Sequence, residues 1–335
     1  MATTNRQILL KSRPVATPGP ENFELVSTPA PEPRDGEVLL RTLFLSLDPY
    51  MRGRMSAGPS YAAPAEIGKP MVGRTVAEIV LSRHPRFAAG DVVTSDNGWQ
   101  EYAVANGGNL QKLDSHVVKP PSLALGLLGM PGMTAYAGLT EIGQPKPGET
   151  VVVSAASGAV GSVVGQIAKL RGCRAVGVAG GPQKNRYVVD ALGFDACVDH
   201  HSDNLKERLA EACPKGIDVY FENVGGVTQR AVWPLLNNFA RVAVCGMIAA
   251  YNDPNPQPGP DLRSVLTKRL TVRGFIVTEL APRYPNAHAE LAAWYHEGKI
   301  KYREDVVDGL EHAPQAFFGL LQGKNFGKLV VHVSD

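Results

Sequence analysis

A stretch near the middle of the chain, residues 150–184, constrains the fold more than any other part of the sequence. Residues 151–153 are a short run of valines, typical of a parallel strand covered on both faces. A glycine turn follows, and apolar residues then recur at the spacing of one buried helix face. These residues are Val160, Val163, Val164, Ile167 and Ala168. With a second strand at residues 174–179, the order predicts a strand–helix–strand unit of a parallel sheet.

The turn between the first strand and the helix reads Ala-Ala-Ser-Gly-Ala-Val-Gly over residues 155–161. It is a variant of the dinucleotide-binding fingerprint in which an alanine stands in place of the first glycine. Gly158 lets the backbone approach a pyrophosphate, and Gly161 lets the helix pack closely on the sheet. The amino terminus of a helix binds phosphate through its amide groups. The sequence therefore predicts a dinucleotide at the start of this helix.

The end of the second strand bears on which dinucleotide binds. An NAD enzyme carries an acidic residue there for the ribose 2′-hydroxyl, whereas this chain has Gly180 and Gly181, followed by Lys184. Without a carboxylate a 2′-phosphate is not repelled, and a nearby lysine attracts it, so the pattern favours NADP over NAD. The alternative is that Lys184 is only a solvated charge at a helix start.

Composition limits the classes of protein to consider. A length of 335 residues suggests two domains, and 44% hydrophobic with 20% charged residues is ordinary for a globular enzyme. A net charge of +2 gives no case for nucleic acid or an anionic membrane surface as a partner. No apolar stretch is long enough to span a bilayer, and the first residues lack the apolar core of a signal peptide. We therefore expect a cytoplasmic protein.

The four cysteines occur singly, with no paired spacing. This pattern favours reduced thiols in the core over disulfides or a zinc site. The residues are Cys173, Cys197, Cys213 and Cys245.

Two kinds of secondary-structure pattern divide the chain. The first part predicts short strands between Pro and Gly turns, at residues 6–11, 23–28, 37–47, 74–81, 91–94 and 99–104. The pattern then alternates between strands at residues 196–199, 217–222, 241–245 and 270–277 and helices at residues 205–212, 227–236 and 262–269. A last strand at residues 328–333 is expected to return to the first domain.

Six motifs, in order along nearly the whole chain, resemble the zinc-independent alkenal/one oxidoreductases of the medium-chain dehydrogenase/reductase superfamily. They lie at residues 48–52, 129–136, 155–161, 222–226, 245–252 and 274–277. Residues 199–201 and 212–223 are similar to the bacterial curcumin reductases of that family, which also includes the prostaglandin reductases. The resemblance implies an α/β protein with a GroES-like β-rich barrel domain and a Rossmann doubly wound parallel-sheet domain. The first would comprise residues 1–126 and 302–335 and the second residues 127–301, in a homodimer formed through the edge of the nucleotide-binding sheet.

The resemblance also implies how NADP(H) is held. The pyrophosphate would lie on Gly158, Ala159, Val160 and Gly161, and the 2′-phosphate on Lys184. His200 stands where prostaglandin reductases carry a tyrosine near the adenosine phosphate; a histidine can still donate a hydrogen bond there. Residues implied to line the rest of the cofactor are Asn223, Cys245, Gly246, Met247, Tyr251, Phe275, Ile276, Val277 and Asn325. Met130 and Thr134 either line the nicotinamide pocket or pack in the core.

No metal is expected. Zinc enzymes of this superfamily carry metal ligands at positions that fall here within residues 47–50 and 68–73, where the chain has neither cysteine nor histidine. His84 and His116 are expected at the surface. His200 and His201 resemble half a metal site, but the pattern provides no cysteine or carboxylate at ligand spacing.

Hydride donation to an activated C=C bond needs positioning and stabilisation of a developing enolate, and no Lewis acid. The sequence therefore predicts an NADPH-dependent reductase of the C=C bond in α,β-unsaturated ketones and aldehydes, with a small-molecule enone or alkenal as its partner. A quinone reductase of the same superfamily and a non-catalytic NADPH-binding protein are the alternatives. Curcumin-like diarylenones, medium-chain 2-alkenals and aryl enones are all open as substrates.

Three tyrosines are candidates for binding the carbonyl oxygen or relaying the proton. Tyr251 follows a strand of the parallel sheet, where ligand-facing residues concentrate. Tyr50 would face the substrate by resemblance to the family, and Tyr61 lies in a Gly-Pro-rich loop that is a candidate lid. Packing for Tyr50, surface exposure for Tyr61 and support of the following loop for Tyr251 are the alternatives, and solvent is an alternative proton donor.

Overall fold

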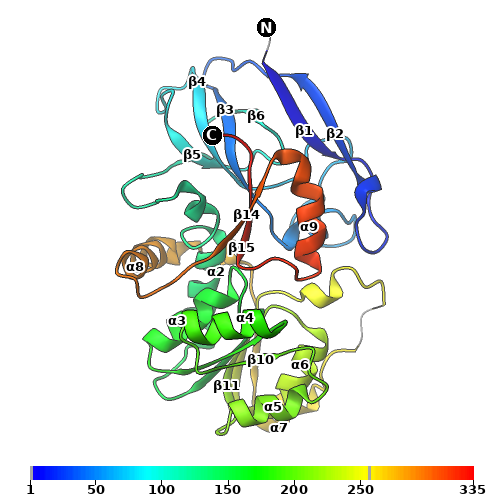
Figure 1. Ribbon diagram of the computed structural model, residues 1–335, viewed down its shortest axis with the longest axis vertical. Coiled ribbons are helices and arrows are strands. Elements are labelled where there is room, and N and C mark those ends of the chain that lie inside the picture. The colour runs from blue at the N-terminus through cyan, green and yellow to red at the C-terminus, as the bar shows by residue number, and fades with distance from the viewer. Residues whose placement is uncertain (1–2, 256–257) are drawn as a thin grey trace. The chain divides into compact units, whose positions relative to one another are not determined.

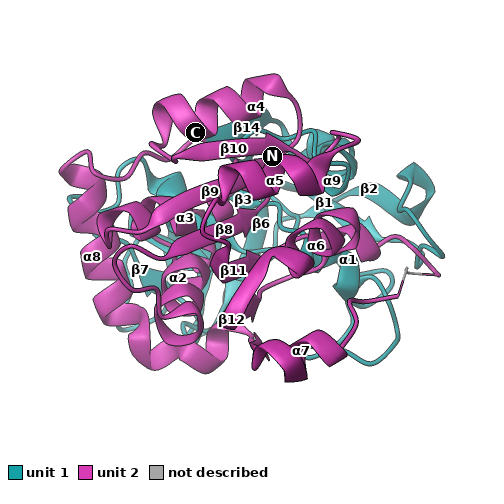
Figure 2. Cartoon of the chain, turned by 90° about the horizontal axis from the view of Figure 1, so that it is seen from below, with its two compact units in different colours: residues 1–125, 304–335 teal, residues 126–303 magenta. Residues whose placement is uncertain are grey.

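The computed structural model describes residues 3–255 and 258–335. The chain forms two compact units, shown in different colours in Figure 2. Unit 1 comprises Met1–Leu125 and Glu304–Asp335, and unit 2 is Gly126–Arg303. None of the helices in the described part of the chain combines the length and the apolar character needed to cross a membrane.

Unit 1 is built mostly from antiparallel strands, and β14 and β15 at one end of its larger sheet pair in parallel. Its smaller sheet pairs β1 (Thr4–Leu10) with β2 (Phe23–Pro29). The larger sheet runs in the order β14-β15-β3-β4-β5-β7, with β6 also paired to β3. Its strands are β3 (Val38–Ser46), β4 (Thr75–Ser82), β5 (Val92–Ser95), β6 (Tyr102–Ala105), β7 (Gln111–Lys112), β14 (Glu304–Asp308) and β15 (Lys328–His332). The short helix α1 (Tyr50–Arg54) follows β3, and α9 (Ala313–Leu321) packs beside β15 (Figure 1).

An aromatic stack forms the centre of the unit 1 core. The ring of Trp99 lies parallel to that of Phe23, with 5.4 Å between ring centroids, and meets the ring of Phe317 edge-on at 5.8 Å. Phe317 belongs to α9, so the carboxyl-terminal segment completes a core begun by the first hundred residues. The end of the chain thus belongs to the first unit.

A buried ion pair fixes the returning strand at the end of β3. The Lys328 ammonium is 1% exposed and donates to Asp48 Oδ1 and to the carbonyl of Leu47, each at 2.8 Å. The Ser46 hydroxyl donates to the other oxygen of the Asp48 carboxylate. Because both charges have several partners, their burial is compensated. The pair holds the start of β15 against the segment that leads to Tyr50.

Unit 2 is organised by a parallel sheet in the order β10-β9-β8-β11-β12-β13. The strands are β8 (Thr150–Ser154), β9 (Arg174–Ala179), β10 (Ala196–Asp199), β11 (Ile217–Glu222), β12 (Leu236–Val244) and β13 (Thr271–Gly274). The order places the first strand of the unit at the centre and reverses between β8 and β11, which is the Rossmann arrangement. The predicted α/β class, with a sheet-rich unit and a Rossmann-type sheet, is confirmed.

Helices cover both faces of this sheet, with α2, α3 and α8 on one face and α5 and α6 on the other (Figure 2). The helices are α2 (Met130–Ala137), α3 (Gly161–Leu170), α4 (Pro182–Arg186), α5 (Leu205–Ala212), α6 (Gly226–Val232), α7 (Arg263–Lys268) and α8 (Tyr284–His296). Of the apolar face predicted for the helix after the glycine turn, Val163, Val164, Ile167 and Ala168 are buried in α3, whereas Val160 precedes the helix and is half-buried. Burial of both faces explains why β8 and β9 read as apolar runs.

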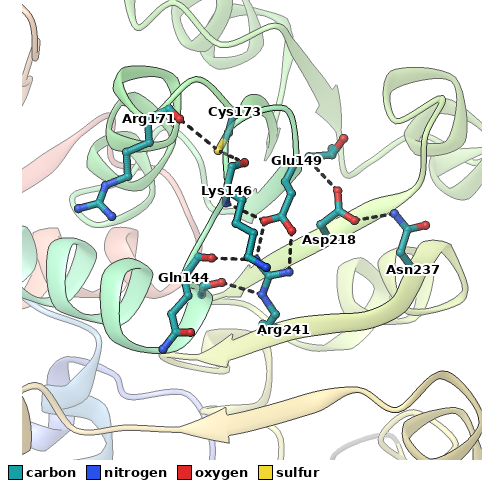
Figure 3. A network of polar contacts seen from close by, with 10 residues as sticks. Gln144, Lys146, Glu149, Arg171, Cys173, Asp218, Asn237 and Arg241 are labelled. Carbon is teal, nitrogen blue, oxygen red and sulfur yellow. Dashed lines mark hydrogen bonds and ion pairs between the residues drawn. The ribbon is translucent and has the colours of Figure 1, made fainter.

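A polar network holds the amino-terminal ends of the parallel strands (Figure 3). Arg241 donates to both oxygens of Glu149, at 3.0 and 2.5 Å, and to the carbonyls of Gly143 and Gln144, both at 2.9 Å. Asp218 accepts from the Thr150 amide at 2.9 Å and from Asn237 at 2.8 Å. The network therefore joins β8, β11 and β12 at the edge opposite their carboxyl ends.

Three predicted elements of unit 2 have different limits in the structure. The helix predicted at residues 227–236 ends at Val232 and gives way to a 3-10 turn, Trp233–Leu235. The following strand then begins at Leu236 rather than at residue 241, with Phe239 at φ 64° where the pairing with β11 is irregular. The strand predicted at residues 270–277 ends at Gly274, because a 3-10 turn starts at Val277.

Candidate functional site

The crevice of a Rossmann sheet lies outside the carboxyl ends of the strands, where the strand order reverses. In unit 2 this point falls between Ser154, the last residue of β8, and Asn223, which follows β11. The Asn223 side chain donates to the Ser154 carbonyl at 2.8 Å, and the Asn223 amide donates to the Ser154 hydroxyl at 2.8 Å. The structure thus fixes Asn223, a predicted cofactor residue, at the crevice.

Glu222, the last residue of β11, is buried and forms hydrogen bonds that hold the segment around Ser154 and Asn223 in place. Its side chain is fully buried, and Oε1 accepts hydrogen bonds from the Ser154 hydroxyl at 3.0 Å and from the amides of Val224 and Gly225 at 2.8 and 2.9 Å. Three donors compensate for the burial of this oxygen, whereas the buried Oε2 has no hydrogen-bond partner among the described residues. The sequence prediction did not include Ser154; the only signal for it is a hydroxyl at the end of an apolar strand.

The loop after β12 lies along the same segment. The amides of Cys245 and Gly246 donate to the Glu222 carbonyl at 2.9 and 3.1 Å, and the Ile248 amide donates to the Asn223 carbonyl at 3.2 Å. Burial, followed by the charge of Glu222, raises the pKa of the Cys245 thiol to about 12. The structure therefore brings together Asn223 and the predicted residues of this loop.

Tyr251 closes that loop. Its hydroxyl accepts a hydrogen bond from the Met247 amide at 3.4 Å, which is long for such a bond. This contact supports the loop that precedes Tyr251, not the following loop that was the alternative role, so both roles stay predictions. It places the phenol over residues Gly246 and Met247, both predicted to line the cofactor.

The glycine turn has the form that the fingerprint requires. A Cβ atom on Gly161 would collide with the Ala155 carbonyl oxygen, so the start of α3 approaches the turn as only glycine allows. Ala155 itself has φ 53°, a left-handed conformation that is strained for alanine. The amino terminus of α3 thus directs its dipole at a tight turn that contains Gly158, Ala159 and Val160, a geometry that fits a pyrophosphate.

At the end of β9, Gly180 and Gly181 lead into α4, which contains Lys184. Burial, the charge of His201 and, as a smaller contribution, the charge of Lys184 lower the pKa of His200. The role of Lys184 and His200 toward a phosphate stays a prediction.

The premise that His200 and His201 lack a carboxylate partner is wrong. Asp199 is the third member of the group, and the ligand atoms of the three side chains lie within 4.8 Å of one another. It is the only such group of three among residues 3–255 and 258–335. Burial opposes ionisation of Asp199, but hydrogen bonds from the amides of His201 and Gly181 lower the pKa of its carboxyl. Elsewhere His116 is exposed as expected, whereas His84 is half-buried.

Other predicted residues of unit 2 have structural partners. Phe275 is buried and meets Phe221 edge-on, with 6.2 Å between ring centroids. Ile276 and Val277, which follow it, are half-buried. The Thr134 hydroxyl donates to the Met130 carbonyl at 2.7 Å within α2; Thr134 is buried and Met130 is half-buried. The roles of these residues toward a cofactor stay predictions.

The remaining predicted residues lie in unit 1. Tyr50 starts α1, and burial, followed by the charges of Asp48 and Asp96, raises the pKa of its phenol above the ordinary value of 10.0. Tyr61 is 64% exposed and acts on Tyr50 electrostatically. Asn325 donates to the Gly327 carbonyl at 2.8 Å in the turn before β15. A neutral Tyr50 is suited to donating a hydrogen bond.

Two family models match the chain. The first is described as the N-terminal domain of oxidoreductase and matches residues 6–113. The second is described as zinc-binding dehydrogenase and matches residues 159–293.

Similar proteins cover almost all of the chain. A protein of Escherichia coli (strain K12) named NADPH-dependent curcumin reductase is 54% identical over 336 residues, which cover 98% of this chain and 97% of that protein. Prostaglandin reductase 1 of Bos taurus is 42% identical over 327 residues, covering 96% and 97%. The crystal structure of CurA from Vibrio vulnificus in complex with NADPH matches with a TM-score of 0.95 and 50% identity, covering 98% of this chain and 99% of that one.

Proposed function

We propose that this chain, which belongs to the alkenal/one oxidoreductase family of the medium-chain dehydrogenases/reductases, uses NADPH to reduce the C=C bond of α,β-unsaturated ketones and aldehydes. The family and the NADP(H) cofactor predicted from the sequence are confirmed, and the protein is an NADP(H)-dependent oxidoreductase acting on CH–CH groups. Curcumin-like diarylenones and 2-alkenals are the substrate classes we propose. The observation that carries the proposal is the convergence of Asn223 and the loop through Tyr251 at the point where the sheet order reverses.

We propose one orientation of NADPH on unit 2. The turn at Gly158 and the first turn of α3 would hold the pyrophosphate, and Lys184 with His200 the 2′-phosphate. Asn223, fixed by Ser154, would then bind the ribose or nicotinamide end. When bound, NADPH supplies the hydride for the β-carbon of the enone. The protein contributes orientation and hydrogen-bond donors.

Tyrosine hydroxyls are the proposed donors to the oxygen that becomes negative as the enolate forms. A phenol that stays neutral donates a hydrogen bond without first losing its own proton. The raised pKa of Tyr50 keeps that phenol neutral, and Tyr251 lies beside the proposed cofactor residues. Tyr61, largely exposed, is proposed as part of a mobile substrate cover. Stabilisation by donors of this kind requires no metal ion, so zinc independence is part of the proposal.

We also propose a homodimer, formed through the β13 edge of the unit 2 sheet. In the described residues β13 pairs with β12 alone, and all four of its residues are exposed. Val272 on this strand is 43% exposed, and Leu262 and Leu266 nearby in sequence are 75% and 78% exposed. An open strand edge beside exposed apolar side chains suits pairing with a second copy. Size-exclusion chromatography with light scattering measures the molar mass in solution and tests this proposal. Wild type should have the mass of a dimer, and Leu266→Glu should favour the monomer.

The activity is tested by following NADPH oxidation with a panel of enones, 2-alkenals, quinones and, in the reverse direction, alcohols with NADP. Product masses identify the bond that is reduced. Enones that gain two hydrogens while alcohols do not react support the proposal. Reduction of quinones alone would establish the quinone reductase alternative, and no turnover of any member would favour a non-catalytic NADPH-binding protein.

A further inference from the structure

The three side chains at the end of β10 are gathered by the backbone. After Asp199 the chain turns, with the His201 amide donating to Asp199 Oδ1 at 3.0 Å and the His200 amide donating to the Ala179 carbonyl at 3.2 Å. The second bond comes from the neighbouring strand β9. The turn is therefore fixed on two sides, and it brings three consecutive potential ligands within 4.8 Å of one another.

Gly180 makes room for both imidazoles. A Cβ atom on Gly180 would lie 2.7 Å from His200 Cε1 and 3.1 Å from His201 Cε1, closer than side chains pack without moving. The ring centroids of His200 and His201 are 3.9 Å apart, and His201 Nδ1 is 3.0 Å from Asp199 Oδ1. The approach of the two rings thus depends on a residue outside the turn.

The donor set selects a class of ion. Two imidazole nitrogens and one carboxylate oxygen suit Zn²⁺, Ni²⁺ or Cu²⁺, whereas Mg²⁺ and Ca²⁺ prefer oxygen ligands alone. The His201 side chain is 69% exposed and that of Asp199 24% exposed, so an ion in water can reach them. Three protein ligands leave further coordination positions of a Zn²⁺ ion for water or another oxygen donor.

The cluster also adjoins a proposed anion site. Gly180, which lies against both imidazoles, is followed by Gly181 and then by α4, and α4 contains Lys184, the residue proposed to hold the 2′-phosphate of NADPH. A phosphate monoester carries close to two negative charges at neutral pH. A divalent cation beside it adds attraction and offers an open coordination position to a phosphate oxygen.

We propose that Asp199, His200 and His201 form a site for a divalent transition-metal ion of the Zn²⁺ class, and that its occupation strengthens the binding of NADPH. The second half rests on the proposed placement of the 2′-phosphate at Lys184. Because such coupling is reciprocal, NADPH also strengthens the binding of the metal. NADH, which lacks the 2′-phosphate, gains nothing from the ion.

Equilibrium dialysis with Zn²⁺ on the untagged, EDTA-treated full chain tests the site directly. Wild type is compared with His201→Ala, which removes a ligand that has no assigned role toward the cofactor, and with His116→Ala, an exposed histidine of unit 1. We expect His201→Ala to bind Zn²⁺ about tenfold more weakly or worse. His116→Ala should bind Zn²⁺ as wild type does. Equal Zn²⁺ binding by His201→Ala and wild type overturns the site.

Fluorescence titration of NADPH and NADH, each with Zn²⁺ and with EDTA, tests the coupling. In wild type, Zn²⁺ should tighten NADPH about fivefold and leave NADH unchanged. His201→Ala should bind NADPH normally in EDTA and show no response to Zn²⁺. Unchanged or weakened NADPH binding in wild type overturns the coupling. Failure of the proposed function is a separate result: enone turnover absent, or no preference for NADPH over NADH, in the metal-free enzyme.

Discussion

The Glu222 carboxylate accepts a hydrogen bond from the Ser154 hydroxyl at 3.0 Å, and this bond joins the carboxyl ends of β11 and β8. The two residues are 68 positions apart in the chain but neighbours where the strand order reverses. The same hydroxyl accepts from the amide of Asn223, and Glu222 also accepts from the two amides that follow. The conformation of Asn223 is therefore determined by a buried carboxylate behind it.

Replacing Glu222 with Ala should damage both stability and cofactor binding. The change leaves three buried donors without their acceptor, which we expect to lower the free energy of unfolding by about 3 kcal/mol. Urea denaturation measures this, and NADPH titration should show weaker binding because Asn223 loses its support. Glu222→Gln keeps one acceptor oxygen and should lose less of both. Wild-type stability and affinity in Glu222→Ala would contradict the assigned role.

Replacing the tyrosines with phenylalanine should distinguish a role of each hydroxyl in catalysis from a role in stabilising the loop. Because the bond between the Tyr251 hydroxyl and the Met247 amide is long, its loss in Tyr251→Phe should cost little stability. We expect kcat for an enone to fall about tenfold or more in Tyr251→Phe and in Tyr50→Phe, since each loses a donor to the enolate. Tyr61→Phe, at an exposed position, should change kcat least.

The pH dependence of kcat provides a check on Tyr50. Its raised pKa means that the phenol stays protonated through its ordinary pKa of 10.0. Steady-state rates in wild type should therefore show no loss from ionisation of the Tyr50 phenol up to about pH 10. Unchanged kcat in both Tyr50→Phe and Tyr251→Phe would instead identify solvent as the proton donor.

The dinucleotide-binding unit could be predicted from the sequence because its signals are local. The run of valines in β8, the glycine turn and the apolar face of α3 lie within one short stretch of chain. Ser154 had no such signal, because its partner Glu222 lies on a strand that is adjacent in the sheet but distant in the sequence. The arrangement around Asp199 and His201 was missed for a related reason. Consecutive ligands converge only through a turn held by β9 and through the absence of a side chain at Gly180.

The limits of β12 show where a local pattern misleads. Residues 233–236 continue an apolar helical pattern, but Pro234 and the start of pairing with β11 convert them to a 3-10 turn and a strand. Helix α8 was missed as well. Only Ala287, Leu291 and Ala292 are buried in it, so it lacks a broad apolar face of the kind that predicted α3.

Arg241→Met should destabilise the protein in a pH-dependent way. Burial alone would raise the pKa of Glu149, but hydrogen bonds from Arg241 and the Lys146 amide lower it below 4.5. A carboxyl with a lowered pKa in the folded state contributes stability above its unfolded pKa and loses it as the pH falls through the folded value. We expect a loss of about 2 kcal/mol at pH 7, since the pair is mostly buried.

Urea denaturation from pH 7 to about pH 4 measures this difference, which should shrink as the pH falls below about 4.5. Arg263→Met removes the exposed pair with Asp261 and is the matched control. That variant should show no measurable change. A difference between wild type and Arg241→Met that is constant with pH would show that lost packing, and not the charge of Glu149, is responsible.

The cysteines should be unreactive while the protein is folded. Burial is the largest cause that raises the pKa of Cys197, Cys213 and Cys245 to about 12, and it also raises the pKa of Cys173. At pH 8 a thiol with a pKa of about 12 is ionised in about one molecule in ten thousand. Mass spectrometry after iodoacetamide treatment should show no modification in buffer and four in urea. Rapid modification of any one of the four cysteines in buffer would contradict the prediction that burial keeps the thiols protonated and unreactive.

Lys184→Ala should change the choice of cofactor more than catalysis. The proposed charged contact with the 2′-phosphate is lost, so we expect KM for NADPH to rise about tenfold to a hundredfold. KM for NADH should hardly change, because NADH has no phosphate to lose. Lys206→Ala on α5, an exposed lysine of the same unit, is the matched control for a general loss of positive charge. Equal increases of KM for both cofactors, or an equal effect of Lys206→Ala, would mean that Lys184 is a solvated charge and that the preference for NADPH arises elsewhere in the crevice.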